Sequence, residues 1–209
     1  MKTVLPRLLA VSDRLRLPGG DLEVWLEGLP AGGVLAVQLR EKDLDDRALF
    51  ELVARARRLL PPATPLVVNG RLDLALAAGA QGVHLPSDGA PVAPLRRHFG
   101  DRVLIGRSTH RAEEVAEAAA QGADYAVFGP VYPTPGKERW GPPKGLEGLA
   151  RASRYGIPVY ALGGIGPENL AEVAAAGAHG AAGIRAFQDV GRLADLVKAV
   201  SRAWPEKAA

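Results

Sequence analysis

Short apolar runs, most of them rich in β-branched residues, recur along the chain at fairly even spacing. Each run has the length of a strand and is apolar at consecutive positions, as expected for a parallel strand that is covered on both faces. In chain order the runs are residues 7–13, 34–40, 65–69, 82–85, 103–108, 124–129, 158–164 and 180–184. The pattern therefore predicts a sheet of buried parallel strands.

Amphipathic helical stretches separate these runs, with clear examples at residues 45–60, 111–122 and 167–177. Alternating strands and helices fit either a closed (β/α)8 barrel or a doubly wound open sheet. Three segments, "AAGAQGVHL", "AQGADYAVFG" and "AAGAHGAAGI", repeat a helix end, a glycine turn and a strand. Such equivalent units favour the barrel. We predict one α/β domain over residues 1–209, a TIM barrel of near-minimal size.

Polar side chains follow the predicted strands, at the end where a barrel of this kind carries its active site. After the second strand, Gln38, Arg40 and Lys42 occupy alternating positions, so they should point together into the barrel mouth, while Glu41 points the other way. Charges aimed at a barrel centre are costly unless they meet a ligand or a partner. The alternative is an exposed strand end with solvated charges. Asn69, after the third strand, is a further candidate for substrate binding.

The end of the seventh predicted strand, "ALGGIGPEN", contains Gly163 and Gly164 and is expected to lead into a helix at Pro167. Together with Ile184 and Arg185 after the last strand, its backbone N–H groups predict a phosphate site. The alternative is that the two glycines only form a tight turn.

A proline-rich stretch at residues 129–145 is too long for a simple connector. Long loops in compact domains are often lids, and Thr134 and Lys137 could close over a phosphorylated substrate. A disordered insertion is the alternative.

His110 follows the fifth predicted strand, in the sequence "VLIGRSTHRAEE". An imidazole titrates near neutral pH, so His110 is a candidate acid and base for proton transfer, with Ser108 beside it in the site. The alternative is an ordinary residue at a helix start, capped by Ser108 or Thr109. His84, at the end of the fourth strand, is the competing base.

Composition narrows the functional classes. The 209 residues are 47% hydrophobic, and the net charge of +3 is spread over scattered basic residues, so we expect no nucleic-acid partner. The chain has no cysteine, no HExxH motif and no carboxylate pair at ligand spacing, which predicts no metal and no cofactor. No apolar run approaches a membrane span, so we expect no membrane partner and a cytoplasmic location. A homodimer is left open.

With these motifs assembled, the chain resembles the thiamine phosphate synthase/TenI family of small TIM barrels over nearly its whole length. The matching stretches are "QLREKD", "VVNGRLDLALAAGAQGVHL", "IGRSTHRAEEVAEAAAQGADYAVFGPVYPTPGK" and "ALGGIGPENLAEVAAAGAHGAAGI". In the synthase branch, the resemblance implies an Asn-Asp pair after the third strand and an Asp after the fourth, which hold Mg²⁺ on a pyrophosphate. Here Asn69 is followed by Gly70, and the second position is Gly89 or, with a shift of one residue, Asp88.

The TenI branch is similar in "NGR", "LPS" and "IGRS-x-H", and its catalytic histidine matches His110. The resemblance therefore predicts an isomerase, a thiazole tautomerase that aromatises a carboxythiazole phosphate by proton transfer without metal, with Arg40 near the substrate carboxylate. One alternative is thiamine phosphate synthase, a Mg²⁺-dependent transferase, because Lys42 and the "PTPGK" loop resemble that branch. The other is a non-catalytic protein that binds thiazole phosphate.

Overall fold

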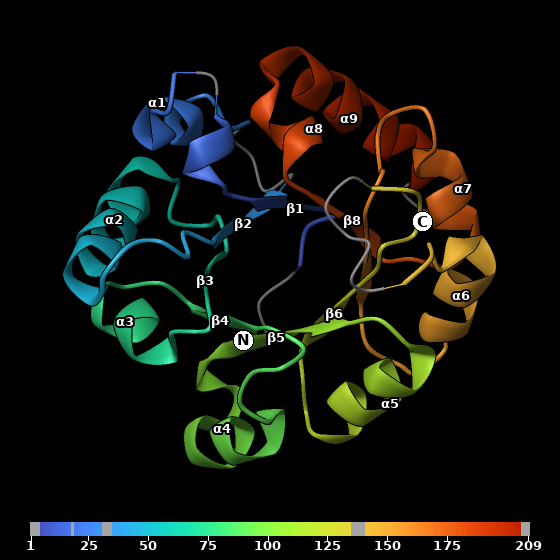
Figure 1. Cartoon of the computed structure of the whole chain (residues 1–209), viewed down its shortest axis with the longest axis horizontal. Helices are drawn as coiled ribbons and strands as arrows, with labels where there is room; N and C mark the ends of the chain where they lie inside the picture. The colour runs from blue at the N-terminus through green and yellow to red at the C-terminus, as the bar shows by residue number, and fades with distance from the viewer. Residues whose placement is uncertain (1–4, 18, 31–34, 135–140, 206–209) are drawn as a thin grey trace.

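The computed structural model describes residues 5–17, 19–30, 35–134 and 141–205, and within them parallel strands close into a barrel that helices surround (Figure 1). The strands follow one another around the barrel in sequence order, and β1 pairs with β8 to close it. They are β1 (Leu8–Val11), β2 (Leu35–Leu39), β3 (Leu66–Asn69), β4 (Gly82–Leu85), β5 (Leu104–Thr109), β6 (Tyr125–Phe128), β7 (Val159–Leu162) and β8 (Gly180–Gly183). The predicted (β/α)8 barrel is confirmed, and the open sheet is wrong.

The helices lie outside the barrel and cover the outer face of the strands (Figure 1). They are α1 (Leu22–Glu27), α2 (Asp46–Leu59), α3 (Leu72–Ala77), α4 (Val92–Phe99), α5 (Ala112–Ala120), α6 (Gly145–Ala152), α7 (Leu170–Ala175), α8 (Arg185–Gln188) and α9 (Val190–Ala203), with 3-10 turns η1 (Arg14–Arg16) and η2 (Gly100–Arg102). Helix α2 begins after Asp45 because the carboxylate of this residue caps the helix, accepting a hydrogen bond from the N–H of Ala48. The helix expected to open at Pro167 begins three residues later, at Leu170.

Side chains that alternate along each strand divide the core into an inner and an outer layer. On β1, Leu9 and Val11 belong to a cluster with Tyr125 and Tyr160, whereas Leu8 packs in a cluster with the helices. The two tyrosine rings meet edge to face, with their centroids 5.6 Å apart. Aromatic and aliphatic side chains therefore fill the barrel interior, as in other barrels of this fold.

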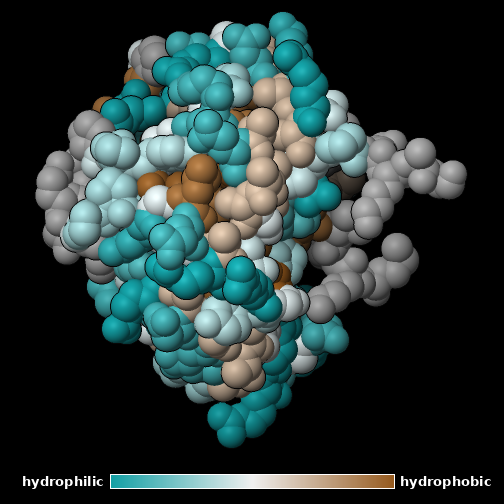
Figure 2. All heavy atoms as spheres, turned by 90° about the vertical axis from the view of Figure 1, so that its right-hand side faces the viewer, coloured by the Kyte–Doolittle hydropathy of each residue, from teal (hydrophilic) through white to brown (hydrophobic). Residues whose placement is uncertain are grey.

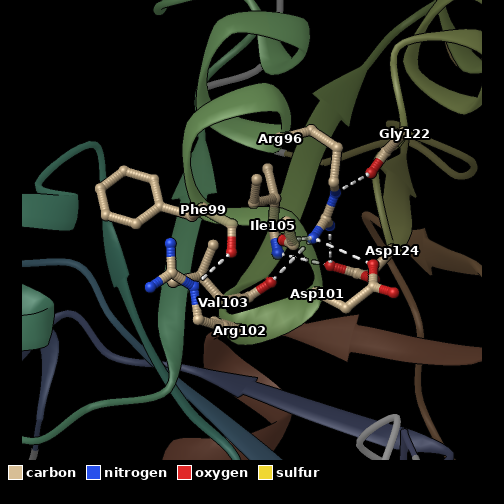
Figure 3. A network of polar contacts seen from close by, with 9 residues as sticks. Arg96, Phe99, Asp101, Arg102, Val103, Ile105, Gly122 and Asp124 are labelled. Atoms are coloured by element: carbon tan, nitrogen blue, oxygen red, sulfur yellow. Dashed lines mark hydrogen bonds and ion pairs between the residues drawn. The ribbon is translucent and has the colours of Figure 1, made fainter.

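A half-buried ion pair links α4 to the amino ends of β5 and β6 (Figure 3). The guanidinium of Arg96 donates to Asp124 at 2.5 Å and to the carbonyl of Gly122 at 2.8 Å. The same Asp124 oxygen accepts the backbone N–H of Ile105 at 2.8 Å. Because the side chains of Arg96 and Asp124 are only 17% and 11% exposed, little water screens the contact.

The outer surface is largely hydrophilic on the side that carries α6 and α7, with a band of apolar residues between the polar ones (Figure 2). Apolar residues among polar ones are normal on a globular protein, because apolar atoms contribute more than half of its accessible surface. Within the described ranges, no helix has the length and apolar character that a membrane crossing needs.

Candidate active site

A cavity of about 120 Å³ opens at the carboxyl ends of the barrel strands. It brings together six of the residues that the sequence nominated, namely Arg40, Lys42, Asn69, Ser108, His110 and Ile184. The other lining residues are Val11, Gln38, His84, Pro86, Ser87, Asp88, Thr109, Val127, Gly129 and Leu162. Strands from across the sequence thus converge on one polar pocket.

Cations from the end of β2 occupy one side of this cavity. Gln38, Arg40 and Lys42 all line it, as their alternation predicts. Gln38 is buried and donates to the Asn69 side chain at 3.3 Å, which joins β2 to β3. Arg40 is half-buried and Lys42 is exposed, so the positive charge lies at the rim, where water meets the pocket.

Glu41 points away from the cavity and organises the backbone behind it. Its carboxylate accepts from the Ser12 hydroxyl at 2.5 Å and from the Arg14 N–H at 3.0 Å. Burial raises the pKa of Glu41, and these hydrogen bonds act in the opposite direction. Ser12 in turn accepts from the backbone N–H of Arg40 at 2.9 Å. The buried pair therefore fixes the strand end that presents Arg40.

Three polar side chains form a hydrogen-bonded chain that runs from the barrel interior to the cavity. His84 Nδ1 lies 3.2 Å from the Tyr125 hydroxyl, and His84 Nε2 lies 2.8 Å from Ser108 Oγ. Burial, and secondarily the charges of Arg107 and Arg40, lower the pKa of His84 to about 3. His84 is therefore neutral near pH 7 and a weak proton acceptor, which argues against it as the general base.

Gly106 makes this chain sterically feasible. The register of the barrel pairs His84 with Gly106 and Gly106 with Tyr125, so the glycine lies between the two side chains. A Cβ atom at position 106 would lie 2.1 Å from Cζ of Tyr125. The tyrosine ring therefore reaches His84 through the space that a side chain on β5 would fill.

His110 lies at the cavity with its ring held by the backbone. Its Nδ1 lies 2.5 Å from the carbonyl of Gly129, which makes Nδ1 the donor and Nε2 the acceptor nitrogen of the neutral ring. The backbone N–H of His110 donates to Glu114 at 2.7 Å. Neither Ser108 nor Thr109 caps helix α5, because the N-cap residue is Arg111 and the Thr109 hydroxyl donates to the carbonyl of Val127.

The Gly163–Gly164 turn lies against the loop that follows β6. Both glycines have positive φ, 100° and 67°, and a Cβ at Gly163 would lie 2.8 Å from Pro130 and 3.0 Å from the Thr134 hydroxyl. This close approach supports the tight-turn interpretation, and it also places Thr134 beside the turn. As far as the described residues show, Thr134, Gly163 and Gly164 do not line the mouth cavity.

Arg185 is the other nominated residue, among those that the structure describes, that does not line this cavity. The exposed Arg185 begins α8 and lines a separate hollow beside α1. Lys137 and the central part of the 129–145 segment lie outside the described residues, so the predicted lid stays a prediction.

Arg107 is a structural residue that the sequence did not reveal. It alternates with Ser108 on β5, and its guanidinium donates to the carbonyls of Ser87 at 2.9 Å and Ala90 at 2.8 Å. These bonds hold the β4–α4 loop, whose residues 86–88 line the cavity. The signal in the sequence was a charge at an alternating strand position, but its partners are backbone carbonyls of another segment.

The cavity does not match the carboxylate set that the synthase pattern uses for Mg²⁺. Hard divalent cations take oxygen ligands, chiefly carboxylates. Of the lining residues that the structure describes, Asp88 alone has a carboxylate. Gly70 offers no side-chain oxygen, and a Cβ at Gly89 would lie 2.9 Å from Cδ of Pro86. In the described ranges, no three His, Asp or Glu residues gather as a metal site.

Comparisons with known proteins point to one family. A family model described as thiamine monophosphate synthase matches residues 8–187. A Geobacter sulfurreducens protein provisionally named thiamine-phosphate synthase is 50% identical over 86% of this chain and 85% of its own length. The thiamine-phosphate synthase of Albidiferax ferrireducens is 42% identical over 87% of this chain and 84% of its own. Thiamine phosphate pyrophosphorylase from Pyrococcus furiosus superposes with a TM-score of 0.82 at 32% identity, covering 94% and 96% of the two chains.

These relatives overturn the choice of branch. The prediction of an isomerase, a thiazole tautomerase, is wrong, because proteins that match most of the chain at 42% and 38% identity are named as the transferase. The prediction rested on the missing carboxylate at Gly70 and on the short motifs "NGR", "LPS" and "IGRS-x-H", which cover a small part of the 209 residues. The catalytic proton transfer assigned to His110 depended on the isomerase reaction and loses its basis with it.

Proposed function

The chain belongs to the thiamine monophosphate synthase family, and we propose on that basis that it is a thiamine phosphate synthase, a transferase. In the proposed reaction, a pyrimidine pyrophosphate and a thiazole phosphate give thiamine phosphate and inorganic pyrophosphate. The observation that carries the proposal is the cationic side of the mouth cavity, where Arg40 and Lys42 adjoin the amide side chains of Gln38 and Asn69. Such a pocket suits a substrate with a large negative charge.

The chemistry of the transfer indicates what the residues must do. The bond between the pyrimidine methylene carbon and the pyrophosphate oxygen breaks, and its electron pair leaves with the pyrophosphate. The lone pair of the thiazole nitrogen then forms the new carbon–nitrogen bond. No proton transfer is required at these atoms, so the main demands are orientation of the two rings and stabilisation of the departing charge.

Arg40 and Lys42 meet the second demand in this proposal. Both are cations at the cavity, and Arg40 is fixed from behind by the Ser12–Glu41 pair. A guanidinium can bind phosphate oxygens through two parallel hydrogen bonds, which strengthen as charge develops on the leaving group. Since the described lining of the cavity contains Asp88 as its one carboxylate, we assign the neutralisation of the leaving group to the side chains of Arg40 and Lys42.

We assign substrate binding to the other residues that the sequence indicated. Asn69, Ser108 and His110 line the cavity and would orient the rings through hydrogen bonds. The phosphate of the thiazole substrate would be held by backbone N–H groups of Gly163, Gly164, Ile184 and Arg185, with Thr134 and Lys137 contributing from the neighbouring loop. A cytoplasmic location, as expected from a sequence without cysteine, is part of the proposal.

The proposal is tested by incubating the purified protein with both substrates and measuring thiamine phosphate and pyrophosphate. We expect the two products in equal amounts. We expect Arg40→Gln to raise KM for the pyrimidine pyrophosphate about tenfold or more, the usual effect of losing a charged hydrogen bond. Arg97→Gln, on the exposed surface of α4, is the matched control and should behave like the parent. A folded protein that forms no thiamine phosphate would refute the proposal.

A further inference from the structure

In the hydrogen-bonded chain Tyr125–His84–Ser108, the positions of the hydrogen atoms decide which group donates and which accepts in each bond. The Tyr125 side chain is 1% exposed, and burial raises the pKa of its hydroxyl, so the proton stays on the oxygen. Among the described residues, the hydrogen-bond partner of this hydroxyl is His84 Nδ1. A buried O–H that donates to no acceptor costs free energy. The Tyr125 hydroxyl is therefore expected to donate to Nδ1.

This donation fixes the tautomer of His84. A neutral imidazole carries one hydrogen, so an Nδ1 that accepts from Tyr125 leaves the hydrogen on Nε2. Nε2 then donates to Ser108 Oγ across 2.8 Å. The opposite tautomer would have Ser108 donate inward to His84, and the Tyr125 hydrogen would have no acceptor in the described structure.

Ser108 is the end of the chain that faces the cavity. Its oxygen already accepts from His84, so its own hydrogen can point into the cavity, which Ser108 lines together with Arg40 and Lys42. We propose that Tyr125 and His84 are positioning residues that set the Ser108 hydroxyl as a hydrogen-bond donor to an anionic oxygen of the substrate. The identity of that substrate rests on the proposed function. The donor–acceptor order from Tyr125 through His84 to Ser108 does not depend on it.

A neutral relay of this kind differs from a serine activated as a nucleophile. A nucleophilic serine would need His84 to accept its proton, which requires the opposite tautomer and a basic imidazole. The buried His84 instead supports a fixed donor, which costs no reorganisation when negative charge develops on the bound oxygen.

The first test measures the tautomer by two-bond ¹H–¹⁵N NMR on histidine-labelled protein at pH 7.5, with the His84 signals identified by their loss in His84→Gln. We expect a protonated Nε2 and an unprotonated Nδ1. Tyr125→Phe keeps the ring over Gly106 and removes only the hydroxyl, so it should weaken this preference and populate both tautomers. A parent protein with the hydrogen on Nδ1, or on both nitrogens, would overturn the proposal.

The second test measures the affinity for inorganic pyrophosphate by calorimetry in a double-mutant cycle. We expect Ser108→Ala to weaken binding about tenfold and Tyr125→Phe about threefold, as for a hydrogen bond to a charged group lost or misdirected. In the Ser108→Ala background, Tyr125→Phe should have no further effect. Equal losses from Tyr125→Phe in both backgrounds would show that Tyr125 does not act through Ser108, and would overturn the proposal.

Tyr160→Phe is the matched control. Tyr160 is also 1% exposed inside the barrel, but its hydroxyl donates to the carbonyl of Pro6 at 2.5 Å and takes no part in the Tyr125–His84–Ser108 hydrogen bonds. We expect Tyr160→Phe to change neither the tautomer of His84 nor the affinity for pyrophosphate. A loss of affinity equal to that caused by Tyr125→Phe would indicate a general packing effect and refute the proposal. Neither readout needs turnover, so a failure of the proposed function would be seen separately in the product assay.

Discussion

Acid should destabilise this protein in part because His84 is buried without charge. Burial, followed by the charges of Arg107 and Arg40, lowers the pKa of His84 from 6.5 to about 3. A histidine whose folded pKa lies below its unfolded value contributes its full stability above pH 6.5. The contribution falls as the pH drops below that value, because the unfolded chain then binds a proton that the folded chain does not.

The size of the effect follows from linkage. Each pH unit between the two pKa values is worth about 1.4 kcal/mol of unfolding free energy, so two units below the unfolded value cost about 2.7 kcal/mol. His84→Gln removes the titrating group and keeps polar atoms in its place. Between pH 7.5 and pH 4.5, we expect the parent to lose ~2.7 kcal/mol more stability than His84→Gln, by the same relation.

Urea unfolding at both pH values, followed by circular dichroism, measures this difference directly. Because carboxylates and His179 titrate in both proteins, their contributions cancel in the comparison. His98→Gln, at the exposed end of α4, is the control and should lose as much stability as the parent. If the parent and His84→Gln lose stability in parallel, the reasoning from burial is wrong.

Three further changes test other parts of the structure. Asp124→Asn should reduce the unfolding free energy by about 2 kcal/mol, because it removes a charge-assisted hydrogen bond to the half-buried Arg96 and leaves the exposed Asp101, at 3.7 Å, as its carboxylate partner. Urea titration would measure this, and a loss below 1 kcal/mol, the range of surface ion pairs, would contradict it. Arg107→Gln should release the β4–α4 loop and speed amide hydrogen exchange at residues 87–90, with unchanged exchange there as the contrary result. Removing metal with EDTA should leave the rate of thiamine phosphate formation unchanged, since the described lining of the cavity offers two cations, Arg40 and Lys42, and a single carboxylate, Asp88; loss of activity that Mg²⁺ restores would contradict this.

The fold could be predicted from the sequence because its signals are local. Runs such as 65–69 and 124–129 are apolar at consecutive positions, and the β2 end alternates so regularly that Gln38, Arg40 and Lys42 were expected on one face. Position in a barrel then identified the mouth as the site. The exact start of α7 escaped prediction, since Gly163 to Asn169 form turns stabilised by the Asn169 side chain.

The chain of three residues within the site could not be predicted in the same way. Tyr125 looks like an ordinary apolar strand residue, and its contact with His84, 41 positions away, depends on the register of three consecutive strands, β4, β5 and β6. Local sequence patterns were also insufficient to predict to which branch of the family the chain belongs. Gly70 at an expected ligand position and a few short motifs suggested a different reaction, whereas the similarity to the synthases extends over most of the chain.

Gly106 also limits how the barrel interior can change in evolution. A Cβ at this position meets the ring of Tyr125 at 2.1 Å, so no larger residue is tolerated while the tyrosine is present. A lineage that gains a side chain at position 106 must first replace Tyr125 with a smaller residue, and it then loses the hydroxyl that contacts His84. We therefore expect side-chain volumes at the two positions to be anticorrelated among homologues.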